Sequence, residues 1–198
     1  MEMLPAAFAS GWASGINAYA TVLVLGLLGR FAQVPGIPEG FQRTDVLIVV
    51  GVLTAIEFVA DKIPYVDSLW DGVSTAVRPV AGAVIGAFYA GATGDLTTVT
   101  LAAVGGVTAL VSHLVKSGLR LAINTSPEPF TNVGASLGSD VAVTGVATLA
   151  ALAPAAAAVV VAILLFAGLL LLWVAARRVR RGWDALQRWR RRGLSPAA

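Results

Sequence analysis

The chain of 198 residues contains no cysteine and a single histidine, and only 13% of its residues are charged. The absence of cysteine excludes disulfides, thiolate metal sites and cysteine nucleophiles, and His113 alone argues against a zinc site. The chain also lacks the GxSxG, HExxH, P-loop and dinucleotide-binding motifs of common enzymes. We therefore expect neither enzymatic activity nor a metal or other cofactor.

The composition that remains is typical of an integral membrane protein. Hydrophobic residues make up 57% of the chain, and its mean hydropathy is +0.81, far from the values of a soluble domain. No Lys or Arg precedes Arg30, so the first apolar segment lacks the basic flank of a secretory signal peptide and is expected to be retained. We predict one transmembrane helical domain over residues 1–176 and an arginine-rich tail over residues 177–198.

The apolar segments predict an all-α, polytopic transmembrane helix bundle with about six spans. The clearest segment, residues 155–176, has no charged residue and about the length needed to cross the hydrocarbon core. Pro154, just before it, suits a tight turn between antiparallel helices. The predicted spans are residues 10–31, 46–62, 70–92, 97–118, 133–153 and 155–176.

Basic residues are concentrated after the last span, where three tryptophans accompany eight arginines as interface anchors. Lys and Arg favour the cytoplasmic side, so the C-terminus is predicted inside, and six crossings would place the N-terminus inside as well. Anionic lipid head groups are the expected partner of the tail, and nucleic acid is not required. The tail arginines are Arg177, Arg178, Arg180, Arg181, Arg188, Arg190, Arg191 and Arg192.

Two rows of ionisable side chains interrupt the apolar segments. Residues three, four or seven apart lie on one face of a helix. Glu57 and Asp61 therefore share a face, as do Asp67 and Asp71 if that stretch is helical, and His113, Lys116 and Arg120 form one stripe. An isolated charge in hydrocarbon costs a few kcal/mol or more, and such rows must pair, face water or extend to the membrane surface. The acidic row contains Glu57, Asp61, Asp67 and Asp71, and the basic row contains His113, Lys116 and Arg120, with Arg78 between them in the sequence.

Two interpretations of these rows remain open. The rows could converge inside the bundle around a polar cavity that opens to the cytoplasm. Alternatively, Asp61, Lys62, Asp67 and Lys116 could be solvated helix ends, or Glu57 could form a purely structural pair with His113 or Arg120.

Two irregular stretches favour a cavity. Residues 13–20 place Ser14, Gly15 and Asn17 inside the first span, where a helix break is expected. Residues 122–140 contain two prolines and two glycines and end at Asp140. They predict a loop or an irregular cavity-lining segment, with Thr131 or Asn132 as the N-cap of the next helix.

The chain also shows a hint of internal duplication. Residues 51–63 and 106–119 each run from glycine through apolar residues to ionisable groups, so the bundle could be built from repeated helical hairpins with broken or re-entrant segments. Gly82 and Gly86 have the spacing that allows close helix packing, within the chain or in a homo-oligomer.

The chain contains three distinctive motifs: SGINAYATVLVLGLLGR (14–30), EFVADKIPYVDSLWDGV (57–73) followed by Arg78-Pro79, and NTSPEPFTNVGASLGSD (124–140). Together they resemble an uncharacterised bacterial membrane family, the domain of unknown function four-one-two-six. The resemblance covers about residues 10–155, and the last helix and tail look like an individual addition. The family implies a membrane protein and no substrate.

We expect a small multi-pass protein of the bacterial cytoplasmic membrane, acting as a channel or carrier for a small ion or solute. The alternative is a membrane scaffold or lipid-binding protein that does not transport. The residues expected along the pathway are Asn17, Glu57, Asp61, Asp67, Asp71, Arg78, His113, Lys116, Arg120, Asn132 and Asp140.

Overall fold

The computed structural model describes residues 3–63, 65–91, 94–124 and 129–193, and the regular structure of these residues is entirely helical. The all-α prediction is therefore confirmed for the described part of the chain. The elements are α1 (Met3–Ile16), α2 (Ala18–Ala32), α3 (Glu39–Gln42), α4 (Thr44–Ala60), α5 (Val66–Ala90), α6 (Asp95–Asn124), α7 (Pro129–Leu152) and α8 (Pro154–Gly193).

Helices α1, α5 and α6 form the centre of the bundle and touch through their backbones at glycines. A Cβ atom added to Gly105 of α6 would lie 2.2 Å from the carbonyl oxygen of Gly82 in α5. One added to Gly11 of α1 would lie 2.5 Å from the Gly105 oxygen, and one at Gly86 would lie 2.1 Å from the Leu101 oxygen. The close packing predicted for Gly82 and Gly86 is thus present within the chain.

The first predicted span, residues 10–31, is interrupted at Asn17. This residue has extended backbone angles, φ −152° and ψ 102°, and its side-chain oxygen accepts a hydrogen bond of 2.8 Å from the Ala20 amide. It therefore acts as the N-cap of α2 and separates two short helices. The break at Asn17 lies within residues 13–20, the stretch in which the sequence predicted it.

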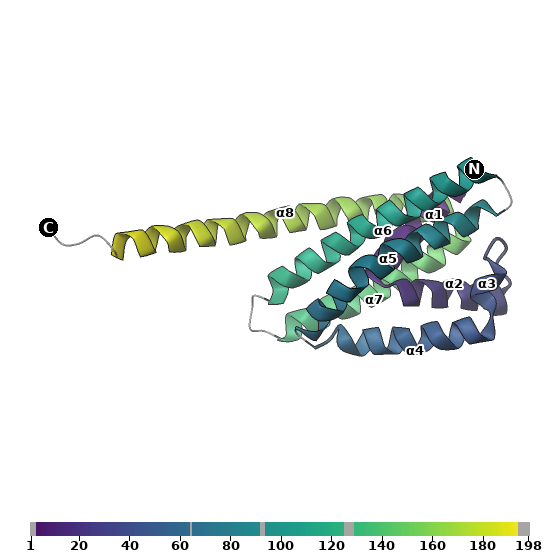
Figure 1. Cartoon of the computed structure of the whole chain (residues 1–198), viewed down its shortest axis with the longest axis horizontal. Coiled ribbons are helices and arrows are strands. Elements are labelled where there is room, and N and C mark those ends of the chain that lie inside the picture. The colour runs from purple at the N-terminus through teal and green to yellow at the C-terminus, as the bar shows by residue number, and fades with distance from the viewer. Residues whose placement is uncertain (1–2, 64, 92–93, 125–128, 194–198) are drawn as a thin grey trace.

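The two short helices form a re-entrant hairpin. Ala7 of α1 packs against Leu101 at the beginning of α6, and the Ile16 carbonyl at the end of α1 reaches Lys116. Helix α2 then returns, and Arg30 donates a 2.7 Å hydrogen bond to Thr44 at the start of α4. Both free ends of the hairpin consequently lie at the same end of the bundle (Figure 1). The prediction that residues 10–31 make one crossing is wrong.

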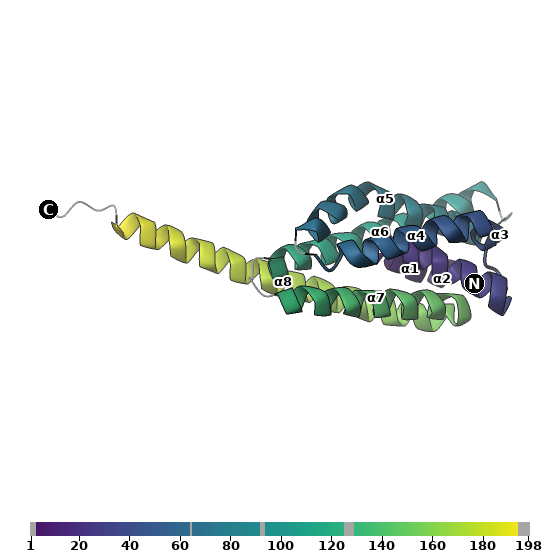
Figure 2. The ribbon, with the colours of Figure 1, turned by 90° about the horizontal axis from the view of Figure 1, so that it is seen from below.

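Four helices, α5, α6, α7 from Phe130 and α8 as far as Trp183, are long and apolar enough to cross a membrane. Helix α4, with 17 residues, is at the short end of that length range. Because the hairpin does not cross, the start of α1 and the end of α8 lie at opposite ends of the molecule (Figures 1 and 2). The prediction of both termini on one side is therefore not met.

The stretch predicted to be irregular, residues 122–140, is mostly helical. Helix α6 continues to Asn124 and α7 begins at Pro129, so Thr131 and Asn132 lie inside α7 and are not its N-cap. A proline is tolerated in the first turn of a helix, where its missing N–H has no intrahelical partner. Gly134 and Gly138 have no atom within 4 Å of an added Cβ, so they do not mark close contacts.

The turn predicted at Pro154 is confirmed, since α7 ends at Leu152 and α8 begins at Pro154. Helix α8 then runs without a break through residue 176 into the arginine-rich segment and projects beyond the bundle (Figure 1).

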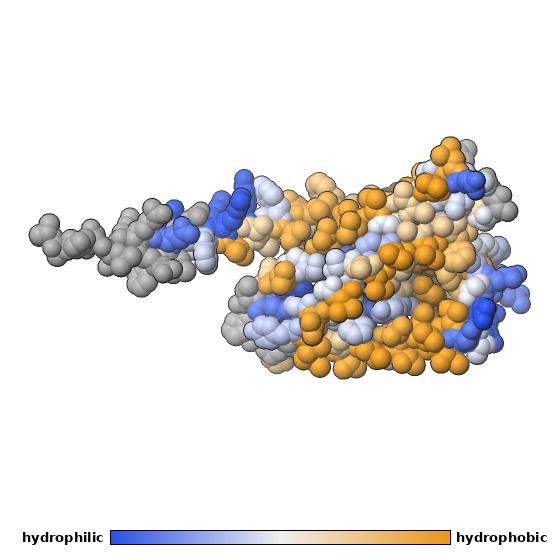
Figure 3. Space-filling model, in the orientation of Figure 1, coloured by the Kyte–Doolittle hydropathy of each residue, from blue (hydrophilic) through white to orange (hydrophobic). Residues whose placement is uncertain are grey.

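Large apolar side chains cover the outside of the bundle, as expected for contact with lipid. Examples are Ile48 and Val52 on α4 and Ile163 and Phe166 on α8, all exposed. Figure 3 shows this apolar surface along the bundle, with hydrophilic residues at the α3 end and on the extension of α8.

Candidate functional site: a buried ionic network beside a helix break

The ionisable rows converge inside the bundle. Helix α4 contributes Glu57 and its C-cap Asp61, α5 contributes Asp67, Asp71 and Arg78, and α6 contributes His113, Lys116 and Arg120; none of these residues is more than 7% exposed. The alternative of solvated helix ends is therefore wrong for Asp61, Asp67 and Lys116, while the Lys62 side chain is 20% exposed.

Arg78 is the centre of one half of the network. Its guanidinium donates to Glu57 Oε1 and, at 2.9 Å, to Asp71 Oδ1. The same Nη1 lies 2.7 Å from Nδ1 of His113. Glu57 thus pairs with Arg78, and not with His113 or Arg120 as the structural alternative supposed.

The surroundings of His113 determine its tautomer. Arg78 can only donate, so Nδ1 must be the acceptor and the imidazole is neutral. Its Nε2–H then donates to the Thr75 hydroxyl at 3.0 Å, and that hydroxyl donates to the Asp71 carbonyl at 2.9 Å. This chain of bonds holds the ring between α5 and α6.

Asp61 is the centre of the other half. Its Oδ2 accepts from Lys116 Nζ at 2.8 Å, and its Oδ1 lies 2.8 Å from Arg120 Nη1. Lys116 also donates to the Ile16 carbonyl at 2.8 Å and lies 3.8 Å from Glu57, which links the two halves. The carbonyl end of α1 is a favourable place for a cation because the helix dipole is negative there.

Asp67 lies at the edge of the network. It accepts hydrogen bonds from the Ser68 amide at 2.6 Å and from the Asn124 side chain at 3.0 Å. Its nearest cation is Arg120, whose Nε is 3.9 Å away. Asp67 therefore ties the start of α5 to the end of α6.

Formal charges in the network do not balance. Four carboxylates face the three cations Arg78, Lys116 and Arg120, and His113 is neutral, so one negative charge is in excess. Several buried oxygens also lack a hydrogen bond among the described residues, namely Glu57 Oε2, Asp61 Oδ1 and Asp71 Oδ2. Unpaired buried charge is costly, so the network is suited to take up a proton or a cation.

Three predicted pathway residues lie outside this network. Asn17 is 2% exposed and serves as the α2 cap. Asn132, on α7, is 1% exposed, and neither atom of its amide group has a hydrogen-bond partner among the described residues. Asp140 pairs with Lys62 at 3.3 Å, which connects α7 to the end of α4.

Sequence reasoning missed two residues that pair with members of the site: Thr75, an exposed residue of α5 that hydrogen-bonds to His113, and Lys62, which pairs with Asp140. Thr75 is four residues after Asp71 and three before Arg78, so its position on the polar face of α5 was a usable signal. Nothing in the local sequence of Lys62 indicated that it would pair with α7.

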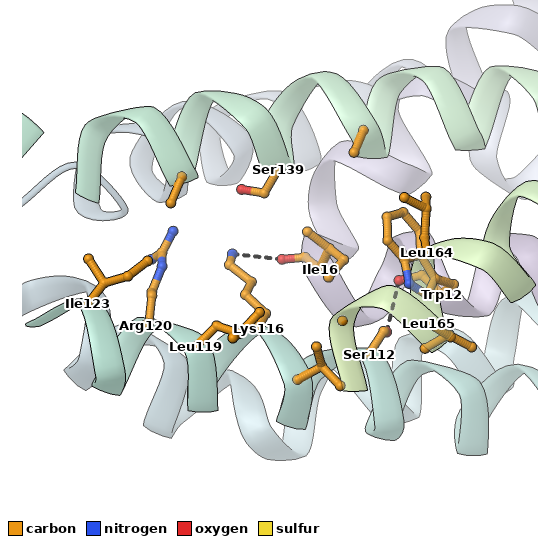
Figure 4. Close-up of a pocket in the computed structure, with 14 residues that line it drawn as sticks. Trp12, Ile16, Ser112, Lys116, Leu119, Arg120, Ile123, Ser139, Leu164 and Leu165 are labelled. Atoms are coloured by element: carbon orange, nitrogen blue, oxygen red, sulfur yellow. Dashed lines mark hydrogen bonds between the residues drawn. The ribbon is translucent and has the colours of Figure 1, made fainter. Parts of the chain in front are cut away.

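A cavity of about 230 Å³ lies next to Lys116 and Arg120, between α1, α6, α7 and α8. Figure 4 shows both cationic side chains on α6 directed toward Ser139 of α7, with Trp12 and Ile16 of α1 at the far side. The cavity therefore adjoins the Asp61 half of the network.

The tail arginines Arg177, Arg178, Arg180, Arg181 and Arg188 are exposed, and the Arg177 guanidinium lies 3.9 Å from the Trp173 ring centre. The side chains of Arg190, Arg191 and Arg192 are outside the described residues.

Among the described residues, no group of three or more His, Cys, Asp or Glu side chains is placed to hold a metal ion. Oxygen atoms of the network could still hold a monovalent cation, which needs fewer carboxylates.

Four helices able to cross a membrane and an ionic network buried among them define a candidate multi-pass membrane protein. The chain belongs to the family described as the domain of unknown function DUF4126, whose model matches residues 4–174. The resemblance is thus confirmed, but the match includes most of the apolar part of α8, so the last helix is not an individual addition. No curated protein and no solved structure matches the chain significantly.

Proposed function

We propose that this protein is a non-enzymatic carrier or channel of the bacterial cytoplasmic membrane that moves a small ion or solute. One observation carries the proposal: four buried carboxylates share three cations and a neutral histidine, which leaves a single negative charge for a proton or cation to neutralise. Ionisable groups within membrane segments commonly mark ion pathways and proton relays.

The broken helix beside the network supports the same function. Carriers often bind solute where interrupted helices end inside the membrane, because the unpaired backbone groups and helix dipoles there can interact with ions. Here α1 ends at Ile16, whose carbonyl accepts from Lys116, and α2 starts after Asn17. A re-entrant hairpin placed against a charged network has no evident purpose in a bundle that only anchors the chain.

The distribution of basic residues suggests how the protein is oriented. The end of α4, the end of α6 and the extension of α8 lie at one end of the bundle (Figure 1), together with Lys62 and the tail arginines. The opposite end holds Arg30 and Arg43. By the positive-inside rule the tail end faces the cytoplasm, so the network is nearer the cytoplasmic side and the start of α1 faces outward.

Within this proposal, the network residues divide into two roles. Glu57 and Asp71 take up the proton or cation, because each has an oxygen without a hydrogen-bond partner among the described residues, whereas Asp61 has a cation 2.8 Å from each of its oxygens. Arg78, Lys116 and Arg120 limit the excess negative charge to one. The remaining predicted pathway residues act around this centre: Asn17 holds the hairpin break, Asp67 and Arg120 join α5 to α6, His113 bridges Arg78 and Thr75, and Asn132 and Asp140 present polar groups from α7.

Flux of protons or cations into proteoliposomes tests the proposal directly. Purified protein is reconstituted in vesicles that contain a pH-sensitive or cation-sensitive dye, and an ion gradient is applied. Glu57→Gln should abolish the flux, because it removes the excess negative charge. Glu39→Gln, at an exposed position on α3, is the matched control and should leave flux unchanged. Equal flux in wild-type and empty vesicles would contradict the proposal.

The exposed arginines on the projecting part of α8 favour a second role, binding of anionic lipid. Each Lys or Arg near an anionic surface contributes about 1 kcal/mol. This role is compatible with transport and is tested separately by removal of the tail.

A further inference from the structure

The cavity beside Lys116 and Arg120 has the features of a ligand site, with two cationic groups on one wall and apolar residues elsewhere. Among the described residues, the lining also includes the hydroxyls of Ser112 and Ser139 and no acidic residue. Its apolar wall includes Trp12, Leu164 and Leu165. A water molecule needs two to four polar partners, which this wall does not supply, so an apolar group suits most of the space better than water.

Donor groups remain available on the cationic wall. An ammonium group has three N–H donors, and Lys116 uses two within the described residues, for Ile16 and Asp61. Arg120 Nη1 lies 2.8 Å from Asp61 Oδ1, a contact that occupies one of its two N–H groups and leaves the other for a ligand. The hydroxyls of Ser112 and Ser139 already donate to backbone carbonyls. The unused donors therefore belong to the two cations.

Two adjacent donors match a carboxylate better than a phosphate. A carboxylate presents two oxygens and one negative charge, and it is the usual partner of Arg and Lys in charge-assisted hydrogen bonds. A phosphate has more acceptor oxygens and more charge than the single lysine proton and Nη1 of Arg120 would satisfy.

The volume restricts the size of the ligand. A cavity of about 230 Å³ is smaller than the roughly 300–1,000 Å³ typical of pockets for drug-sized ligands. At the ~30 Å³ that a water molecule occupies in the liquid, it has room for about eight non-hydrogen atoms. A longer acyl chain would have to extend out of this space through its open side.

We infer that this cavity binds a short-chain organic monocarboxylate, with the carboxylate on Lys116 and Arg120 and the apolar chain against Trp12, Leu164 and Leu165. The inference rests on the proposed transport function, and it names the class of solute that the protein would carry. A bound carboxylate would share Lys116 and Arg120 with Asp61. Because the network already has one negative charge in excess, the carboxylate would bind together with the proton or cation that neutralises that charge.

Binding of radiolabelled hexanoate to the purified, detergent-solubilised full-length chain tests the inference without requiring transport. We expect saturable binding that unlabelled hexanoate displaces. Neither 1-hexanol, which has the chain without the charge, nor acetate, nor inorganic phosphate should compete comparably. Absence of saturable binding at millimolar hexanoate, or equal competition by 1-hexanol, would overturn the inference.

Two variants locate the binding. Ala142→Leu fills the cavity from α7 without removing a member of the ionic network, and should weaken hexanoate binding about tenfold or more. Ala156→Leu, at an exposed position on α8, is the matched control and should bind as the wild type does. Arg120→Gln should also weaken binding; if it fails to fold, Ala142→Leu still decides. Unchanged affinity in Ala142→Leu would refute the site.

The outcome is separable from that of the transport assay. Ion flux that depends on Glu57 without hexanoate binding would refute the carboxylate site and leave the carrier proposal intact. Hexanoate binding that is sensitive to Ala142→Leu, without flux in vesicles, would retain the site and refute transport.

Discussion

Substitution of Arg78 by Met should be among the most destabilising single changes in this protein. The guanidinium is 1% exposed and contacts the carboxylates of Glu57, which is fully buried, and Asp71 at 2.9 Å. Met keeps most of the side-chain volume but leaves both carboxylates without their cation. Loss of one partner of a buried ion pair costs about 3–5 kcal/mol, and for a chain of this size each kcal/mol lowers the melting temperature by about 2–4 °C.

Arg78→Met should therefore lower the melting temperature in detergent, measured by circular dichroism, by about 6–20 °C. Arg43→Met is the matched control, because Arg43 pairs with Asp45 at a site where both side chains are about two-thirds exposed, and it should melt as the wild type does. The double variant Arg78→Met with Glu57→Gln restores the network's excess charge to one and should recover about half of the loss. If the single variant melts within error of the Arg43 control, our account of the network is wrong.

Three further predictions concern packing, the helix break and the tail. Gly105→Ala should destabilise the protein by about 1–3 kcal/mol, because its Cβ would meet the α5 backbone. Gly72→Ala, in open space on the same bundle, should be neutral or stabilising in the same melting assay, and equal losses would contradict the packing argument. Asn17→Ala should cost about 0.5–2 kcal/mol through loss of the cap, whereas Asn17→Ser should retain most of the stability. Deletion of residues 177–198 should abolish binding to vesicles of anionic lipid in a flotation assay and leave ion flux unchanged; flux that disappears with the tail would contradict the assignment of the tail to lipid binding alone.

Local sequence was sufficient to predict most helices because hydrocarbon requires long runs of apolar residues with satisfied backbones. The apolar runs at 46–62, 97–118 and 155–176 correspond to α4, α6 and α8, and Pro154 marks the last turn. The convergence of opposite charges was one of two interpretations that the sequence left open, because ionisable groups at helix ends can also be solvated.

Other features could not be read from local sequence. A broken crossing and a re-entrant hairpin have the same composition, and the difference at Asn17 lies in the direction that α2 takes after the break. Helix α7 begins at Pro129 despite the glycines and prolines of residues 122–140, because membrane packing favours an intact helix over exposed backbone. The cavity beside Arg120 is formed by four helices distant in sequence.

The order of amino acids by itself determined that this chain is helical, with apolar segments long enough to span a membrane and ionisable groups on defined helix faces. Both properties depend on residues a few positions apart. Only the tertiary structure decided that Arg78 is the partner of Glu57, that α1 and α2 return to one end of the bundle, and that Lys116 and Arg120 border a cavity. Those outcomes depend on which helices pack together. The backbone contacts at Gly11, Gly82 and Gly105 hold α1, α5 and α6 close to one another. Side chains from distant segments thereby come within hydrogen-bonding distance.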